Sequence, residues 1–251
     1  MKAVILCAGY GKRLKPYTDT FQKSMLPINN KPLLEYVLNG LIYAGFKDFI
    51  FVVGYKKEQI LNYFKNGENW NINIQYVEQK KLNGTGGALL KCQSVINNSH
   101  FFLTWGDILV PYSVYKEILE KFNQEHYNFI LISNYTDDPF KGAAVYIKHD
   151  YCIDIIEKPS QSESKSKFNN TGIFILSKEI FEILSTLKPS KRGEIEFTDA
   201  LRIGIKSRKW KVRVLKMKKN QFRGDFGDRD TYENLKEEST WLKEIINDKK
   251  D

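Results

Sequence analysis

The most constraining feature of this chain is a regular alternation of short apolar runs and amphipathic segments in its first part. The apolar runs are typical of buried strands, and the segments between them carry apolar residues at helical spacing. The predicted strands are Lys2–Cys7, Asp48–Val53, Ile72–Val77 and His100–Trp105, and the predicted helices are Pro32–Tyr43, Lys57–Phe64 and Gly86–Ile96. Strict strand–helix alternation favours a parallel sheet with helices on both faces.

The pattern changes after residue 110, where strands also follow one another directly. A hairpin is predicted around His149-Asp150, and the polar, low-complexity segment Ser160–Lys167 is expected to be a mobile surface loop. The remaining predicted elements are helices Val114–Asn123, Lys178–Leu184, Phe197–Ile205 and Asp230–Asn247, and strands Phe129–Asn134, Ala143–Ile147, Cys152–Ile156, Thr171–Leu176 and Lys211–Lys216. The sequence thus predicts the α/β class: a Rossmann-like, mixed and mainly parallel sheet flanked by helices, in a single domain over residues 1–251.

Composition narrows the class of protein. No run of about 18 apolar residues is present, which excludes a membrane-spanning helix. The net charge of +9 suits anionic ligands, but the Lys and Arg residues are scattered and form no block interleaved with aromatics, so we expect no nucleic-acid partner. The three cysteines have no paired spacing, which argues against a disulfide framework or a zinc site. The apolar start ends after Ala8 in a Gly/Lys/Arg loop, and we expect a cytoplasmic enzyme.

The loop after the first predicted strand is rich in glycine and cations. In open α/β sheets, ligands bind at the carboxyl ends of the strands, and glycines there let backbone N–H groups turn toward phosphate oxygens. The loop is neither a dinucleotide-binding fingerprint, which would need glycine at Leu14, nor a P-loop, in which Ser or Thr would replace Arg13. The candidate phosphate-binding residues are Ala8, Gly9, Gly11, Lys12, Arg13, Lys15 and Lys23.

Five further short motifs lie at predicted strand ends or loops. They are Gly84-Thr85-Gly86-Gly87-Ala88, Gly106-Asp107, Glu157-Lys158-Pro159, Asn170-Thr171-Gly172 and Asp225-Phe226-Gly227. Each has an ordinary structural explanation when taken alone. Thr85 can be a helix N-cap, Pro159 can end a strand, and the Gly-Asp and Asp-Phe-Gly segments can be turns.

Taken together and in this order, the motifs resemble those of sugar-1-phosphate nucleotidyltransferases, the NDP-sugar pyrophosphorylases. The resemblance begins with Gly-x-Gly-Lys-Arg-Leu-x-Pro-x-Thr and the segments Lys23–Ile28 and Lys31–Leu33, and it continues along nearly the whole chain. This family includes glucose-1-phosphate thymidylyltransferases and uridylyltransferases. The resemblance implies a GT-A-like nucleotide-diphospho-sugar transferase fold, with a nucleotide-binding half at 1–110 and a sugar-phosphate-binding half with a closing helix at 111–251.

The resemblance also implies the reaction and the roles of single residues. A sugar 1-phosphate attacks the α-phosphorus of a nucleoside triphosphate in line, with Mg2+ assistance, giving an NDP-sugar and pyrophosphate. UTP or dTTP and glucose 1-phosphate are the favoured substrates, and a homodimer is expected. The implied catalytic residues are Arg13, Lys23, Asp107, Lys158 and Asp225, of which Asp107 and Asp225 bind the metal. The implied nucleotide-binding residues are Ala8, Gly9, Gly11, Lys12, Arg13, Gln79, Gly84, Thr85 and Gly86, and the sugar-phosphate-binding residues are Gly142, Glu157, Lys158, Asn170 and Thr171.

Several departures from the family leave the substrate pair open. Lys12 stands where many relatives have Thr or Ser, Ser24-Met25 replaces Pro-Leu, and Trp105 replaces Asn. Asn83 lengthens the base loop by one residue, which leaves the alignment of Gln79 uncertain. The alternatives are a cytidylyl- or guanylyltransferase acting on a heptose phosphate, phosphocholine or inositol phosphate, and a non-catalytic subunit that senses nucleotide sugars.

Overall fold

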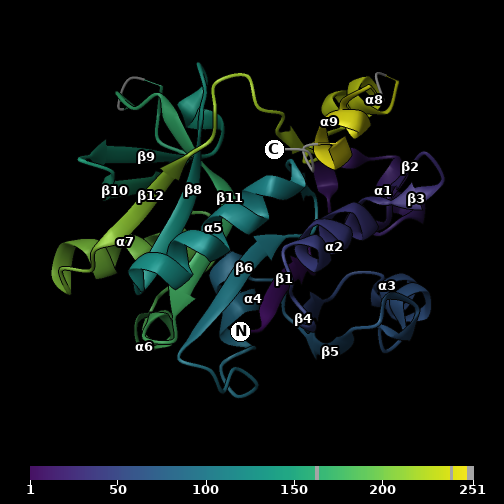
Figure 1. The fold of residues 1–251 in the computed structure, drawn as a ribbon, viewed down its shortest axis with the longest axis horizontal. Helices are drawn as coiled ribbons and strands as arrows, with labels where there is room; N and C mark the ends of the chain where they lie inside the picture. Colours follow the sequence, from purple (N-terminus) through teal and green to yellow (C-terminus); the bar gives the residue numbers. More distant parts are fainter. Residues whose placement is uncertain (162–163, 238–239, 248–251) are drawn as a thin grey trace. The chain divides into compact units, whose positions relative to one another are not determined.

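The structure is a computed structural model that describes residues 1–161, 164–237 and 240–247, and it divides into two compact units (Figure 1). Unit 1 comprises Met1–Lys80, Thr104–Glu117 and the segment from Asn220 onward, and unit 2 comprises Lys81–Leu103 and Ile118–Lys219. The chain passes between the units after Lys80 and Lys219, and also within strand β6 (His100–Trp105) and helix α5 (Tyr112–Glu125).

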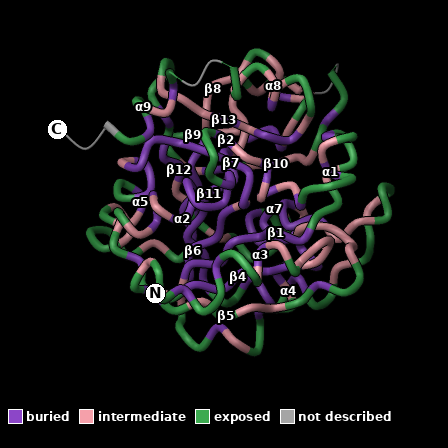
Figure 2. The backbone as a smooth tube through the Cα atoms, turned by 90° about the vertical axis from the view of Figure 1, so that its right-hand side faces the viewer, coloured by how far each residue is buried: buried purple, intermediate pink, exposed green. Residues whose placement is uncertain are grey.

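Unit 1 contains three parallel strands in the order β5-β4-β1. These are β1 (Ala3–Cys7), β4 (Asp48–Val53) and β5 (Asn73–Glu78), and their pairing confirms the parallel arrangement predicted from the alternation. All five residues of β1 are buried, as the unbroken apolar run AVILC requires of a strand covered on both faces. Figure 2 shows this buried backbone along β1.

Helices and short strands complete unit 1. Helix α2 (Leu33–Tyr43) starts after Pro32, whose ψ of 146° is extended, and Gly40 lets it approach Tyr115, because a Cβ there would lie 2.6 Å from that ring. The other helices are α1 (Tyr17–Thr20), α3 (Lys57–Phe64), α8 (Arg229–Glu237) and α9 (Trp241–Asn247), and the short strands are β2 (Pro27–Ile28), β3 (Lys31–Pro32), β7 (Ile108–Leu109) and β13 (Gly224–Asp225). The prediction of one closing helix over 230–247 was wrong, since two helices occupy the described parts of that range; residues 238–239 lie outside the described residues.

Unit 2 contains a mixed sheet, as predicted for the second part of the chain. Strand β8 pairs antiparallel with β11 and parallel with β12, while β10 pairs antiparallel with both β9 and β12. The bounds are β8 (Phe129–Tyr135), β9 (Ala143–Lys148), β10 (Tyr151–Glu157), β11 (Phe168–Ser177) and β12 (Val212–Lys216). The β9–β10 hairpin turns at His149 and Asp150 with φ values of 47° and 61°, which confirms the predicted hairpin.

The helices of unit 2 are α4 (Thr85–Leu90), α6 (Ile180–Leu184) and α7 (Phe197–Ser207). The helix predicted over Gly86–Ile96 is too long: α4 ends at Leu90, and the following N–H groups of Cys92 and Gln93 bond carbonyls three residues back, in turns. Part of the predicted mobile loop Ser160–Lys167, namely 162–163, lies outside the described residues. Among the helices that the structure describes, none combines the length and apolar character that crossing a membrane needs.

Candidate active site

The glycine loop after β1 is held by local contacts. Gly11 has a left-handed φ of 63°, and a Cβ at this position would lie 2.9 Å from Cγ2 of Thr18, so glycine is required on both counts. The Thr18 hydroxyl donates to the Gly11 carbonyl at 3.0 Å. The side chains of Lys12 and Arg13 leave this loop at the surface, in the short 3-10 turn Lys12–Leu14, whereas the ammonium of Lys15 is paired with Asp19 at 3.0 Å.

Lys23 is positioned by its buried neighbour Gln22. The Gln22 side-chain amide donates to the carbonyl of Cys7, the last residue of β1, at 2.6 Å, and its oxygen accepts from the Ser24 N–H at 2.6 Å. These two bonds fasten the turn that carries Lys23 to the carboxyl end of β1. From there the Lys23 ammonium forms an ion pair with the carboxylate of Asp107.

Asp107 and Asp225 lie on facing segments of unit 1. Strands β7 and β13 are antiparallel partners, with Asp225 opposite Ile108, and the N–H of Phe226 donates to the Asp107 carbonyl at 3.1 Å. Asp107 is 5% exposed. The structure therefore brings together two carboxylates that are far apart in the sequence.

Arg13 approaches the same place as Asp225. A Cβ added at Gly227 would lie 2.8 Å from Oδ1 of Asp225 and 3.2 Å from Nη2 of Arg13, so both side chains flank the Gly227 α-carbon. The other carboxylate oxygen of Asp225 pairs with Arg223 at 3.2 Å. Unit 1 thus gathers Arg13, Lys23 and the two aspartates in one region, with Arg223 as an addition that the sequence analysis missed.

The donor set of this region fits a hard divalent cation. Both aspartates offer carboxylate oxygens, and among the described residues no group of three or more His, Cys, Asp or Glu side chains could hold a metal. Mg2+ commonly takes one or two carboxylates and completes its octahedron with water and substrate phosphates. The two aspartates therefore fit an ion that is bound together with a phosphate-bearing substrate.

The predicted base loop, Gly84 to Gly86, is hydrogen-bonded to the backbone of residues 195–197. The N–H of Gly86 donates to the carbonyl of Ile195 at 2.8 Å, and Gly84 has a φ of 100° with that carbonyl only 2.6 Å from where a Cβ would stand. The Thr85 hydroxyl accepts from the N–H of Phe197, the first residue of α7, at 3.2 Å. These residues hold the loop against the segment before α7. Gln79 belongs to unit 1, where it is buried and its N–H donates to Val53.

The predicted sugar-phosphate residues converge in unit 2. Glu157 ends β10 opposite Ala143, and the N–H of Lys158 donates to the Gly142 carbonyl at 3.0 Å. Lys158 has a left-handed φ of 40°, a conformation that costs a non-glycine residue about 1 kcal/mol or more and that concentrates at functional sites. Asn170 and Thr171 lie on β11, which contacts β9 through the pair Asn169 and Ala144.

Two of these residues already have partners in the protein. Oδ1 of Asn170 accepts from the N–H of Gly172 at 2.8 Å, and the fully buried Thr171 directs its hydroxyl to Asn134 at 3.4 Å. Their polar groups therefore shape the bulge in β11, where pairing with β8 is interrupted between Asn170 and Phe174.

Three residues around Glu157 were missed by the sequence analysis. Thr198 donates to its Oε2 at 3.0 Å, and Arg192 lies 3.6 Å from its Oε1 and 3.1 Å from the carboxylate of Glu196. Burial and the neighbouring Glu157 carboxylate raise the pKa of Glu196. The signal in the sequence was the run of acidic and apolar residues in alternation, Glu194 to Phe197, directly before a helix.

Comparison with known proteins gives a family match over most of the chain. Residues 2–241 match the sequence profile described as "Nucleotidyl transferase". A protein of Methanococcus vannielii named "Bifunctional protein GlmU" is 40% identical over 83% of this chain, and a "Glucose-1-phosphate thymidylyltransferase" of Xanthomonas campestris is 31% identical over 79% of it. The aligned regions cover 49% and 67% of those two proteins, so this chain spans about half the length of the GlmU relatives.

The fold is also similar to that of solved structures. A crystal structure of UDP-glucose pyrophosphorylase complexed with UDP-glucose superimposes with a TM-score of 0.85 at 30% identity, covering 95% of this chain and 97% of the other. This similarity confirms the predicted mixed α/β fold of sheet and flanking helices.

Proposed function

The chain belongs to the nucleotidyl transferase family, and we propose that it joins a nucleoside triphosphate to a sugar 1-phosphate, giving an NDP-sugar and pyrophosphate. UTP or dTTP and glucose 1-phosphate are the substrates that we favour. This preference is supported by similarity to a UDP-glucose pyrophosphorylase structure and to a glucose-1-phosphate thymidylyltransferase.

One observation carries the proposal. Asp107 directly precedes β7, and Asp225 ends the facing strand β13, with the cations Lys23 and Arg13 beside them. Two acidic groups next to two basic groups suit a reaction between anions, because the acids can hold a cation and the bases can bind phosphate oxygens directly.

Asp107 and Asp225 would hold Mg2+, in keeping with the general dependence of this family on divalent metals. When bound, the ion supplies charge neutralisation between the two reacting phosphates. The ion pair of Lys23 with Asp107 then has a second use: Lys23 balances the buried carboxylate in the free protein and is a phosphate ligand once substrate and metal are bound.

The remaining residues position the phosphates. Arg13 binds the phosphates that depart as pyrophosphate, Lys23 binds the nucleotide phosphates at the point of attack, and Lys158 binds the sugar phosphate. An oxygen of the sugar phosphate forms a bond to the α-phosphorus while the bond from that phosphorus to the bridging oxygen breaks, and pyrophosphate leaves with the electron pair. No proton needs to move, since the attacking phosphate is already ionised at neutral pH. Most of the rate enhancement comes from placement and charge.

The other predicted residues are proposed to select the substrates. Ala8, Gly9, Gly11 and Lys12 contact the nucleotide phosphates. A contact with the base is proposed for Gln79 and, separately, for the loop residues Gly84, Thr85 and Gly86, and contacts with the sugar are proposed for Gly142, Glu157, Asn170 and Thr171. The Glu157 carboxylate accepts hydrogen bonds from sugar hydroxyls.

The proposal is tested by measuring pyrophosphate release from UTP, dTTP, CTP and GTP, each with glucose 1-phosphate, other sugar 1-phosphates, phosphocholine and inositol phosphate. Turnover with UTP or dTTP and a sugar 1-phosphate supports it. Turnover only with another pair replaces the substrate assignment, and release from no pair favours a nucleotide-sugar-sensing subunit.

The metal assignment has its own test. Asp107→Asn keeps the size of the side chain, so the fold should persist by circular dichroism while turnover falls to background. Unchanged activity at any Mg2+ concentration would remove Asp107 from the metal site.

A further inference from the structure

Helix α9 packs against the segment of unit 1 that carries Asp225. Its first residue, Trp241, and Ile245, one turn further along the same face, are both buried. Helix α9 has seven residues, and a helix of this length is not stable by itself in water. Its stability therefore depends on the contacts of these two side chains with the rest of unit 1.

The Trp241 ring contacts the chain on both sides of Asp225. It stacks on Phe222, with ring centroids 4.9 Å apart and planes 2° apart, and its centroid lies 5.8 Å from that of Phe226. The two phenylalanine rings also enclose Gly224, because a Cβ there would stand 2.8 Å from Phe226 and 2.9 Å from Phe222. Three aromatic rings thus fix the backbone next to Asp225.

Hydrogen bonds connect this aromatic cluster to other parts of unit 1. The indole N–H of Trp241 donates to the carbonyl of Leu235 in α8 at 2.6 Å. From α8, the hydroxyl of Tyr232 donates to the carbonyl of Pro27 in β2 at 2.9 Å, and the Tyr232 ring meets the ring of Tyr17 edge-on, with centroids 5.0 Å apart. The cluster is therefore joined through α8 to β2 and to α1, which follows the glycine loop.

The pairing of β13 with β7 is short and needs support from other contacts. Each strand contributes two residues to this separate two-stranded sheet, and the N–H of Phe226 adds one bond to the carbonyl of Asp107. A two-stranded ladder is marginally stable in water even when it is longer. If the ladder opened, Asp225 would move away from Asp107, so the rings that hold β13 in place also hold the two carboxylates together.

We infer that Trp241 is a positioning residue for the metal site: through the two phenylalanine rings it holds β13 on β7 and so sets the place of Asp225 beside Asp107. The inference rests on the proposed function, in which both aspartates bind Mg2+. This ion demands near-ideal octahedral geometry, so a displaced carboxylate binds it more weakly. Loosening α9 should therefore weaken metal binding and slow the reaction, although Trp241 acts through the backbone of Asp225.

The direct test is hydrogen exchange at the Phe226 amide, the donor to Asp107, in the full chain without metal or nucleotide. Trp241→Leu removes the ring stack, and exchange at this amide should become faster by about tenfold or more. Trp241→Phe keeps an aromatic ring, and exchange should stay within about threefold of wild type. Unchanged exchange in Trp241→Leu would overturn the inference, whatever the outcome for the proposed reaction.

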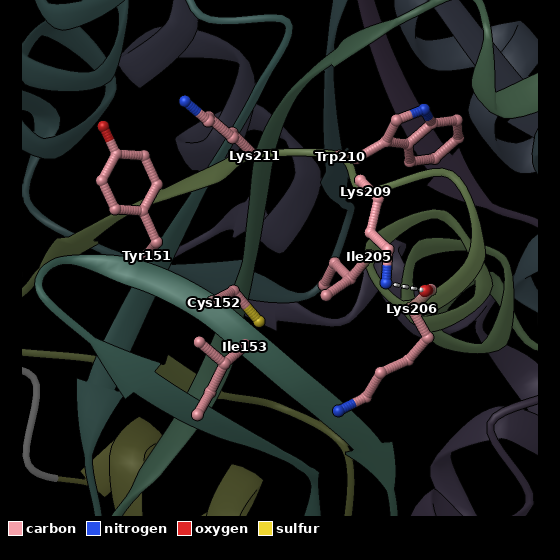
Figure 3. A pocket seen from close by; sticks show the side chains of 8 residues that line it. All are labelled: Tyr151, Cys152, Ile153, Ile205, Lys206, Lys209, Trp210 and Lys211. Carbon is pink, nitrogen blue, oxygen red and sulfur yellow. Dashed lines mark hydrogen bonds between the residues drawn. The ribbon is translucent and has the colours of Figure 1, made fainter.

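Trp210→Leu is the matched control. Trp210 also stacks on a phenylalanine, Phe129, with centroids 4.2 Å apart, but it belongs to unit 2, where it lines a cavity between β10 and α7 (Figure 3). Its loss should lower the free energy of unfolding in urea and leave exchange at Phe226 within about threefold of wild type. Equal acceleration at Phe226 in both leucine variants would reduce the effect to a general loss of stability and overturn the inference.

The consequence for the metal is measured by pyrophosphate release as a function of Mg2+. Trp241→Leu should raise the Mg2+ concentration for half-maximal rate about tenfold or more and lower kcat by about ten- to a hundredfold, while KM for the sugar 1-phosphate stays within about threefold. Trp210→Leu should leave the Mg2+ dependence unchanged. If Trp241→Leu does not fold, Phe222→Leu, which removes the partly exposed partner of the stack, should change exchange and Mg2+ dependence in the same direction.

The two measurements separate the inference from the proposed function. Faster exchange at Phe226 together with a higher Mg2+ requirement supports the positioning role of Trp241. Faster exchange with an unchanged Mg2+ dependence would overturn that role. Release of pyrophosphate from no substrate pair, even by the wild type, would remove the proposed function and the metal role with it, while exchange would still decide whether Trp241 holds β13 on β7.

Discussion

The substitution Gly227→Ala tests whether Asp225 and Arg13 act at the reacting phosphates. A methyl group at position 227 would stand 2.8 Å from Oδ1 of Asp225 and 3.2 Å from Nη2 of Arg13, where ordinary contact begins at 3.4 Å. The carboxylate must therefore retreat by roughly half an ångström. Gly227 is outside the left-handed region, so alanine fits its backbone and the clash falls on the two side chains.

The expected effect is kinetic. A misplacement of about 1 Å can cost about a hundredfold in rate, so kcat should fall by roughly ten- to a hundredfold and more Mg2+ should be needed for half-maximal rate. The free energy of unfolding should change little. Alanine lowers the conformational entropy of the unfolded chain, which stabilises the folded protein by about 0.4–1 kcal/mol and offsets part of the strain. Pyrophosphate release as a function of Mg2+, together with urea unfolding, measures both quantities.

Asp228→Ala is the matched control. Oδ1 of Asp228 accepts from the N–H of Thr231 and caps α8, so its loss should cost about 1 kcal/mol of stability without changing kcat. Kinetics of Gly227→Ala that equal those of the wild type, at every Mg2+ concentration, would refute the assignment of Asp225 and Arg13.

Two further predictions concern unit 2. Thr198→Val removes the hydroxyl that donates to Glu157, whereas Thr198→Ser keeps it. Because a hydrogen bond to a charged group contributes about 1.5–3 kcal/mol, KM for the sugar 1-phosphate should rise about tenfold or more in the valine variant and stay close to wild type in the serine variant. Equal KM values for the two variants would contradict this role of Thr198. The raised pKa of Glu196 means that the folded state holds this proton more tightly than the unfolded chain, so the stabilisation is full below about pH 4 and is lost as pH rises through the raised pKa. Glu196→Gln should therefore stabilise the protein at pH 7, with a gain that shrinks toward pH 4 in urea unfolding, and a gain independent of pH would argue against burial as the cause.

The larger elements were predictable because their signals are local and periodic. The run AVILC has the length and the apolar character of a buried strand, and the spacing in Lys57–Phe64 predicted the bounds of α3. Strands β7 and β13 were not predicted, since two residues are too few to show a period. They form because the segments that carry Asp107 and Asp225 pair across more than a hundred residues of chain.

The partners of the site residues were harder to predict than the residues themselves. Thr85 could be expected to cap a helix, but the N–H that its hydroxyl accepts belongs to α7, 112 residues further on. Thr198 and Arg192 have no motif of their own and matter only because folding brings them to Glu157. Sequence motifs thus indicate candidate site residues, whereas the partners that orient those residues are set by tertiary contacts.

One departure from the family pattern, at Ser24, has a structural explanation. Ser24 stands where relatives often have proline, and its N–H donates to Gln22 in the bridge that ties the turn of Lys23 to Cys7. Proline has no N–H and could not complete this bridge, so the position would be held in another way. The serine also lies close under Gly106, where a Cβ would stand 2.8 Å from the Ser24 hydroxyl. Ser24, Gln22 and Gly106 therefore form one packing solution that sets Lys23 against Asp107, and exchanging the serine alone for the family residue would disturb that ion pair rather than restore it.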